Sequence, residues 1–109
     1  MKATYWQRGE SLDYVNSGTS VIEANTIINL GTRIAVAGTS INPGEKGSIH
    51  VTGVYRINKK DTGAIKFGTA VYFDEAGITS SAEGGYTPAG YAAEDSAEGA
   101  EMILVKLLG

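Results

Sequence analysis

The residue types that most often carry chemistry are few in this 109-residue chain. The one histidine, His50, would need a carboxylate or a second ligand beside it to act as a general base or to bind a metal, and its sequence neighbours offer neither. The carboxylate pairs at 74–75 and 94–95 would form an acid–base dyad only if the fold brought them into one pocket. Ser80 and Ser81 lack the glycine-flanked turn of a nucleophile elbow. We therefore expect no enzyme activity, no bound metal and no cofactor.

Binding of nucleotides and nucleic acids is also disfavoured. The segment nearest to a phosphate-binding loop is 44–48 (GEKGS), which lacks the second glycine before the lysine and the helix that should follow. The net charge is −3, and the nine basic residues are scattered, with Lys59 and Lys60 as the one adjacent pair. Because a phosphate backbone is bound by clustered Lys and Arg, we expect no nucleic-acid partner.

The bulk composition predicts where the protein is made. The absence of cysteine excludes a disulfide framework and a thiolate nucleophile, which favours synthesis and assembly in a cytoplasm. No signal segment is expected at the start, and the longest aliphatic run, 102–105, is far too short to span a bilayer. We expect no membrane partner.

The elements that must position these residues are expected to be strands. Fifteen glycines beside two prolines suit many short strands joined by tight turns, and no apolar period of 3.6 residues persists. We predict an all-β fold with little helix, a small single-domain β-barrel or sandwich over 1–109. Residues 1–8 are expected to form an N-terminal arm or an edge strand.

The longest predicted strand is 47–60, about twice the usual length, with alternate apolar residues from Ile49 to Ile57. Gly53 interrupts the alternation and predicts a bulge, a bend or a close backbone approach. Further strands are expected at 12–15, 86–93 and 101–108, the last with 102–105 buried on both faces. Hairpins are expected between 26–30 and 33–37 and across the turn 74–77.

A faint internal repeat links the two halves. Segment 33–37, a turn at Gly44 and a strand resembles 90–93, a turn at Gly99 and a strand. This pattern indicates either a duplication or the ordinary succession of strands and glycine turns in a β-barrel.

The aromatic residues are the main candidates for contacts. Tyr5 and Trp6 are adjacent, which predicts either an arm that adds a strand to a partner or, for Trp6, a place in the core. Tyr55, Tyr72, Tyr86 and Tyr91 are expected either in a subunit interface, where tyrosine is favoured, or in the core.

Several segments together resemble one family. They are 7–10 (QRGE) with 12–14 (LDY), 41–47 (INPGEKG) running into 51–55 (VTGVY), 67–74 (FGTAVYFD) with 77–79 (GIT), and 89–92 (AGYA) before the final strand. The chain resembles the small tailed-bacteriophage head proteins formerly filed as a domain of unknown function and now understood as capsid decoration, or cement, proteins. The similarity covers nearly the whole chain.

The resemblance implies a β-barrel or β-tulip-like sandwich that forms a homotrimer on the outside of an expanded phage or prophage head. There it would bind the major capsid protein and stabilise the capsid. The predicted capsid or trimer contacts are Tyr5, Trp6, Arg8, Tyr55 and Tyr86, and the predicted location is the virion surface after synthesis in the bacterial cytoplasm. Some relatives carry a RecA-like recombinase label, against which the missing phosphate loop argues.

A binding module is the alternative function. Loops 38–46 and 80–88 would then display side chains for a glycan or a peptide. This hypothesis requires Tyr86 to lie exposed around a groove.

Overall fold

The computed structural model describes residues 1–108, which form nine strands and no helix. The strands are β1 (Ser11–Val15), β2 (Ile27–Asn29), β3 (Ile34–Ala37), β4 (Lys46–His50), β5 (Val54–Asn58), β6 (Ala70–Asp74), β7 (Gly77–Thr79), β8 (Thr87–Ala92) and β9 (Met102–Leu107). The predicted all-β class and the near absence of helix are confirmed.

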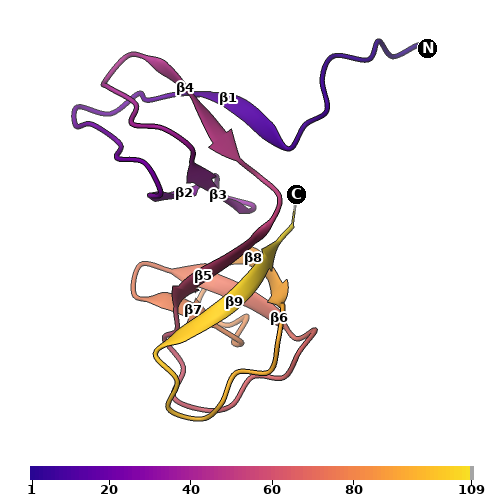
Figure 1. The fold of residues 1–109 in the computed structure, drawn as a ribbon, viewed down its shortest axis with the longest axis vertical. Helices are drawn as coiled ribbons and strands as arrows, with labels where there is room; N and C mark the ends of the chain where they lie inside the picture. Colours follow the sequence, from indigo (N-terminus) through magenta and orange to yellow (C-terminus); the bar gives the residue numbers. More distant parts are fainter. Residues whose placement is uncertain (109) are drawn as a thin grey trace.

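The strands form two antiparallel sheets (Figure 1). The first sheet has the order β1-β4-β3-β2 and the second the order β5-β9-β8-β6-β7. The two edges of the second sheet meet at one isolated parallel bridge, between Lys59 and Ile78. Over residues 1–108 neither sheet closes into a barrel, so the barrel form of the prediction is wrong and an open two-sheet arrangement replaces it.

The predicted long strand over 47–60 is two strands. β4 pairs with β1 and β3 in the first sheet, whereas β5 pairs with β9 in the second. Between them Gly53 has a φ of 114°, which L side chains rarely adopt, and the chain passes there from one sheet to the other (Figure 1). The bend predicted at Gly53 is confirmed, and the single strand is wrong.

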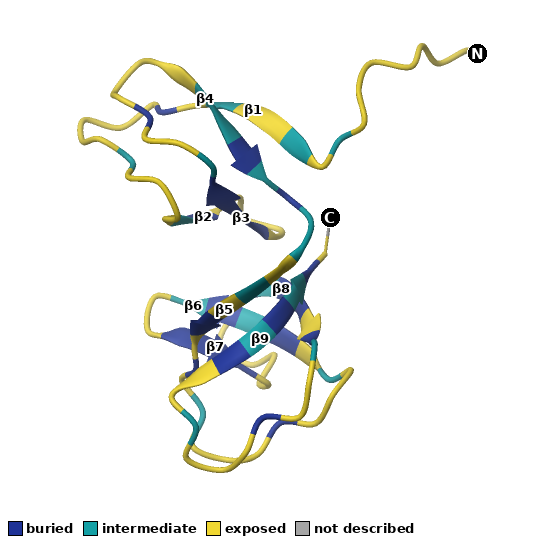
Figure 2. Ribbon diagram, in the orientation of Figure 1, coloured by how far each residue is buried: buried dark blue, intermediate teal, exposed yellow. Residues whose placement is uncertain are grey.

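The apolar side chains form two cores, and β3 lies between them (Figure 2). Ala35 and Ala37 belong to the first core, while Ile34 and Val36 point the other way into the second core, against the second sheet. Every residue of β3 is buried because both of its faces are covered. The first core consists of Ile28, Ala35, Ala37, Ile41, Ile49 and Val51, and the second is the larger of the two.

Two further strand predictions have opposite outcomes. The expected hairpins form, as β2 with β3 and as β6 with β7. In β9, however, burial alternates, so Ile103 and Val105 are buried while Met102 is 39% exposed. Burial of 102–105 on both faces is therefore wrong, because only one side of the second sheet is covered.

The faint repeat in the sequence corresponds to two matching backbone structures. We call residues 22–26 with 41–45 corner 1, and residues 65–69 with 96–100 corner 2. In corner 1, Ile22 and Ile41 exchange both backbone hydrogen bonds, at 2.9 and 2.8 Å; in corner 2, Ile65 and Ser96 do the same at 2.9 and 2.7 Å. Each corner contains two tight turns closed by an i to i+3 bond.

The third residue of all four turns has a φ between 71° and 87°, and these residues are Asn25, Gly44, Gly68 and Gly99. Glycine and asparagine are the residues that accept this conformation most readily. Each corner is also hydrogen-bonded to a neighbouring strand in the same way, corner 1 to Ala37 of β3 and corner 2 to Ala92 of β8. The repeat therefore includes matching turns and matching backbone hydrogen bonds, which is more than a succession of strands and glycine turns.

Candidate functional site

The first candidate site is the N-terminal arm, which we define as residues 1–9. These residues lie outside every strand and extend away from the first sheet (Figure 1). Tyr5 is 82% exposed and Trp6 is 88% exposed. Gly9 has a φ of 85° at the point where the arm meets β1. Since large aromatic side chains are rarely so exposed, the arm presents two strong candidates for a partner contact.

The core alternative for Trp6 does not hold for the described chain. An indole that is 88% exposed has left nearly all its surface in water, so it contributes little to either core. Arg8 lies on the same arm and is also exposed. The structure therefore brings Tyr5, Trp6 and Arg8 together on one segment.

Tyr55 and Tyr86 lie elsewhere and do not join the arm in one site. Tyr55, on β5, is half-buried, pairs with Val105 of β9 and packs against the second core. Much of its ring is therefore already used for packing. Its role in a subunit or capsid contact stays a prediction.

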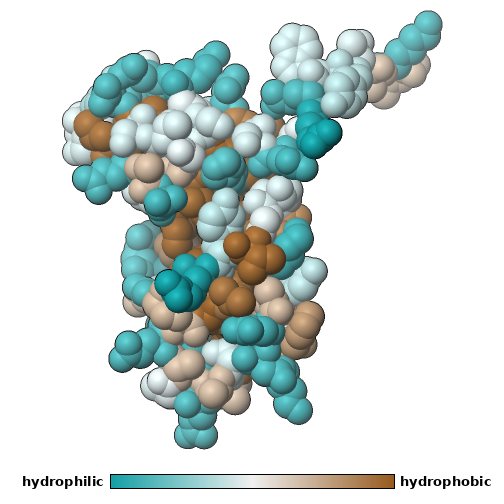
Figure 3. All heavy atoms as spheres, in the orientation of Figure 1, coloured by the Kyte–Doolittle hydropathy of each residue, from teal (hydrophilic) through white to brown (hydrophobic). Residues whose placement is uncertain are grey.

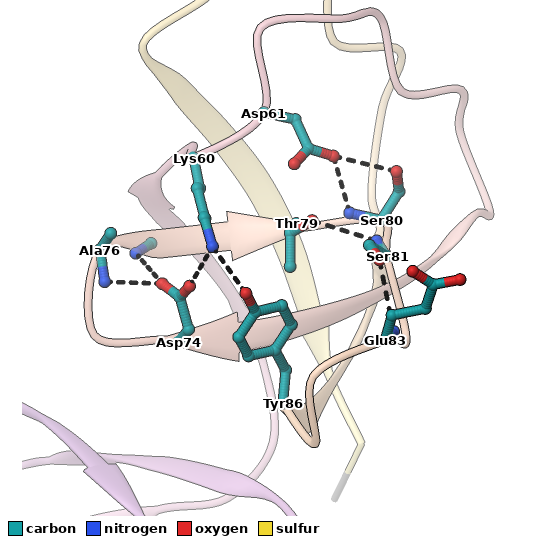
Figure 4. A network of polar contacts seen from close by, with 10 residues as sticks. Lys60, Asp61, Asp74, Ala76, Thr79, Ser80, Ser81, Glu83 and Tyr86 are labelled. Carbon is teal, nitrogen blue, oxygen red and sulfur yellow. Dashed lines mark hydrogen bonds and ion pairs between the residues drawn. The ribbon is translucent and has the colours of Figure 1, made fainter.

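Tyr86 belongs to a polar network on the second sheet (Figure 4). The Lys60 ammonium forms an ion pair with Asp74 and donates a 2.9 Å hydrogen bond to the Tyr86 hydroxyl. The Asp74 carboxylate also accepts backbone hydrogen bonds from Ala76 and Gly77 in the β6–β7 turn. The Lys60 contact, aided by these amides, lowers the pKa of Asp74, and the contact with Asp74 raises the pKa of Lys60.

The neighbouring loop is held by a second set of bonds (Figure 4). The Asp61 carboxylate accepts hydrogen bonds of 2.9 Å from both the backbone N–H and the hydroxyl of Ser80. Burial opposes ionisation of Asp61, but the hydrogen bonds outweigh it and lower its pKa. With Tyr86 half-buried and tied to Lys60, this loop does not present a free aromatic ring of the kind that a loop-based ligand site requires.

The residues considered for catalysis are separated. The His50 ring contacts the hydroxyl of Ser11, with 3.2 Å between Nδ1 and Oγ, and no carboxylate of residues 1–108 hydrogen-bonds to it. An open groove of about 350 Å³ lies between Ile27 of the first sheet and Phe73 of the second, and His50 is not in its lining. The described part of the chain contains no group of three or more His, Asp or Glu side chains that could hold a metal ion. Asp74 and Asp95 accept backbone hydrogen bonds in turns, which is a structural use of those carboxylates.

A second candidate site is the outward face of the second sheet, of which the sequence analysis named Tyr91 but not its apolar neighbours. Val54 is 52% exposed and Tyr91 is 43% exposed on this face, beside the half-buried Leu104. Val54 and Tyr91 both lie opposite Lys106 of β9. Figure 3 shows hydrophobic side chains gathered over β5 and β9 with hydrophilic ones around them. The signal for this face in the sequence is the apolar run 102–105 of β9, whose outward residues are as apolar as its inward ones.

The fold and these two sites together define a small all-β protein whose exposed apolar groups lie on an arm and on a sheet face. A protein-family model described as phage cement protein matches residues 6–107, so the chain belongs to the phage cement protein family. Comparisons with curated proteins and with solved structures found no match. The resemblance identified from the sequence is confirmed.

Membership in this family gives the chain a role in decorating the phage capsid and a place on the virion. It also makes the phage capsid its site of association. None of residues 1–108 belongs to a helix able to cross a lipid bilayer.

Proposed function

We propose that this protein binds the outer surface of the major capsid protein lattice as a homotrimer and stabilises the expanded head without enzymatic activity. The observation that carries the proposal is the exposure of Tyr5 and Trp6, 82% and 88%, on a segment outside both sheets. Aromatic side chains at that exposure gain most of their stabilisation by burial against a partner. An extended segment can also add a strand to a partner's sheet edge, with main-chain hydrogen bonds supplying affinity.

The outward face of the second sheet supports self-association. Val54, Leu104 and Tyr91 place apolar surface there, and Arg56 and Lys106 supply charge on the same strands. Interfaces combine an apolar centre with a polar rim, and tyrosine and arginine are enriched in them. A trimer carries three copies of the arm. Once one arm is bound, the other two are held near their own sites at a high effective concentration, so three weak contacts together bind more tightly than one.

Electrostatics supports an external position. A net charge of −3 repels the packaged genome, so a place on the outer surface is favoured over one against DNA. The contact requires no cofactor, metal or membrane, because the apolar and charged groups of the arm and the sheet face suffice.

The test is light scattering on the purified protein, followed by co-sedimentation with expanded, undecorated heads. We expect saturable binding that approaches about three copies per local threefold position, as a closed cyclic oligomer requires. Absence of binding to cognate heads, both expanded and unexpanded, would contradict the proposal.

Removal of the first six residues separates binding from folding. Because Tyr5 and Trp6 lie outside both cores, the shortened protein should unfold at the same urea concentration as the full chain and yet be lost from heads on washing. Circular dichroism and co-sedimentation measure the two properties. A shortened protein that stays on heads as well as the full chain would remove the arm from the proposed contact.

A further inference from the structure

The arm differs in charge from the rest of the chain. Lys2 and Arg8 are the charged side chains of residues 1–9, which contain no acidic residue. Since the whole chain carries −3, residues 10–109 carry −5. The arm is therefore a cationic segment attached to an anionic protein.

Neither cation is neutralised within the described chain. In residues 1–108, Lys2 and Arg8 are exposed and form no hydrogen bond or ion pair. The loop richest in acidic residues, 94–101, includes one half of corner 2 and lies at the opposite end of the long axis from the arm (Figure 1). The arm consequently lies far from the acidic loop of its own chain (Figure 1).

The aromatic rings lie between the two charges along the arm. Tyr5 and Trp6 follow Lys2 by three and four residues, and Arg8 comes two residues after Trp6. Trp, Tyr and Arg are the residues that most often dominate binding energy at protein interfaces. Arginine can in addition hold a carboxylate through two parallel hydrogen bonds. This order of groups fits an apolar slot whose rim carries carboxylates.

Two other classes of partner fit less well. Two cations can neutralise only about two phosphates, which gives little affinity for nucleic acid at physiological salt. Attachment to anionic lipid through electrostatics uses clusters of about four to eight basic residues. A protein surface, where a few buried contacts suffice, is the better match.

We propose that the arm docks on an acidic protein surface of the phage capsid, where Trp6 fills an apolar slot and Lys2 and Arg8 pair with carboxylates at its rim. This inference rests on the proposed function and adds the chemistry of the partner. The cations steer association and make it sensitive to salt, whereas the indole supplies most of the burial.

The test compares two double charge reversals in the full chain by co-sedimentation with expanded heads. The arm variant is Lys2→Glu with Arg8→Glu, and the matched control is Lys46→Glu with Lys66→Glu, two exposed lysines of the body. The arm variant should bind about tenfold more weakly, since each reversal removes one exposed ion pair and places a like charge beside the partner's carboxylate. The control should bind as the wild type does, and raising the salt should weaken the wild type more than the arm variant.

The outcomes are distinguishable. Equal binding by the arm variant and the control would overturn the acidic partner while leaving the cement function intact. Failure of the wild type to bind heads at all would overturn the proposed function and this inference with it. A change from trimer to monomer on arm reversal, seen by light scattering, would show that a second copy is the partner, and arm-dependent binding to DNA or to anionic vesicles would likewise overturn the inference.

Discussion

The two corners share one backbone hydrogen-bond pattern but differ in the side chains at their centres. Corner 1 has Ile22 bridged to Ile41, which is 1% exposed in the first core. Corner 2 has Ile65 bridged to Ser96, which is 7% exposed and whose hydroxyl is the one buried side-chain polar atom without a partner in residues 1–108. The comparison teaches that backbone bonds and turn residues specify the corner, whereas the central side chains determine how much it stabilises the core.

A second difference lies in β3 and β8, the strands that precede Ile41 of corner 1 and Ser96 of corner 2. Ala35 and Gly90 each stand two residues before the alanine that joins strand to corner, Ala37 in β3 and Ala92 in β8. Ala35 is fully buried and carries its methyl group in the first core. Gly90 has a φ of 143°, and a Cβ placed there would collide with the carbonyl oxygen of Lys106 in β9. At this position β3 has a methyl group packed in the first core, whereas β8 has a close contact with the neighbouring strand β9.

The largest expected effect comes from placing in β8, at position 90, the alanine that β3 has at the matching position 35. Gly90→Ala should destabilise the protein by at least about 3 kcal/mol, because β8 and β9 must separate and the residue must keep a strained backbone. Urea unfolding measures the loss. Gly85→Ala is the control, since Gly85 also has a positive φ but has open space around it, and it should cost only about 1 kcal/mol. Equal losses in the two variants would contradict the account.

The second effect tests the apolar centre of corner 1. Ile41→Ala should cost about 2–4 kcal/mol in urea unfolding, because it leaves a cavity in the small first core. Gly47 packs directly against Ile41 and has no side chain with which to fill the space. A loss below about 1 kcal/mol would mean that the first core collapses around the cavity.

The matching change at the centre of corner 2 should not destabilise the protein, in contrast to Ile41→Ala. Ser96→Ala removes a buried hydroxyl that has no partner and should change the free energy of unfolding by no more than about 1 kcal/mol, with stabilisation as the expected sign. The same urea series, run beside Ile41→Ala, gives the comparison. A loss equal to that of Ile41→Ala would show that the hydroxyl has a stabilising contact.

The smallest effect concerns the Lys60–Asp74–Tyr86 network, which only the second sheet carries among the described residues. Asp74 has a lowered pKa, so its contribution to stability is present above its ordinary value of 3.8 and is lost as the pH falls through the lowered one. Lys60 has a raised pKa, so its contribution is present below 10.5 and is lost as the pH rises through the raised value. Between these limits both groups are charged and the pair is intact.

Asp74→Asn should therefore lower Tm slightly at neutral pH, and the difference from the wild type should shrink in acid. The pair is exposed, so added salt should shrink the difference as well. Glu75→Gln, a change of one charge at the adjacent exposed residue, is the control and should leave Tm and its pH dependence unchanged. A difference in Tm that persists in strong acid would assign the effect to the turn amides and not to Lys60.

Much of the fold could be predicted because alternation and glycine turns act locally. Strand alternation and the turn before Gly77 gave the β6–β7 hairpin, since a short connection leaves few other pairings. The passage between sheets at 51–53 could not be predicted from alternation, because two strands in succession keep the same period of two as a single strand. Gly53 alone signalled it.

The candidate site was less accessible to the sequence. Adjacent Tyr5 and Trp6 give no periodicity, so an arm and a core residue had equal support until the structure placed Trp6 in solvent. In β9 the outward residues Met102 and Leu104 are as apolar as the inward ones, and a residue's hydrophobicity does not say whether a second layer covers it. Only the position of the second core, on a single side of the second sheet, resolves that question.

The measurement that tests the central claim most directly is cryo-electron microscopy of expanded, undecorated heads incubated with the full chain. The account predicts ordered density on the outer surface of the capsid lattice at local threefold positions, with the arm in contact with the major capsid protein. A map without added density, or with density confined to the inner surface, would contradict it.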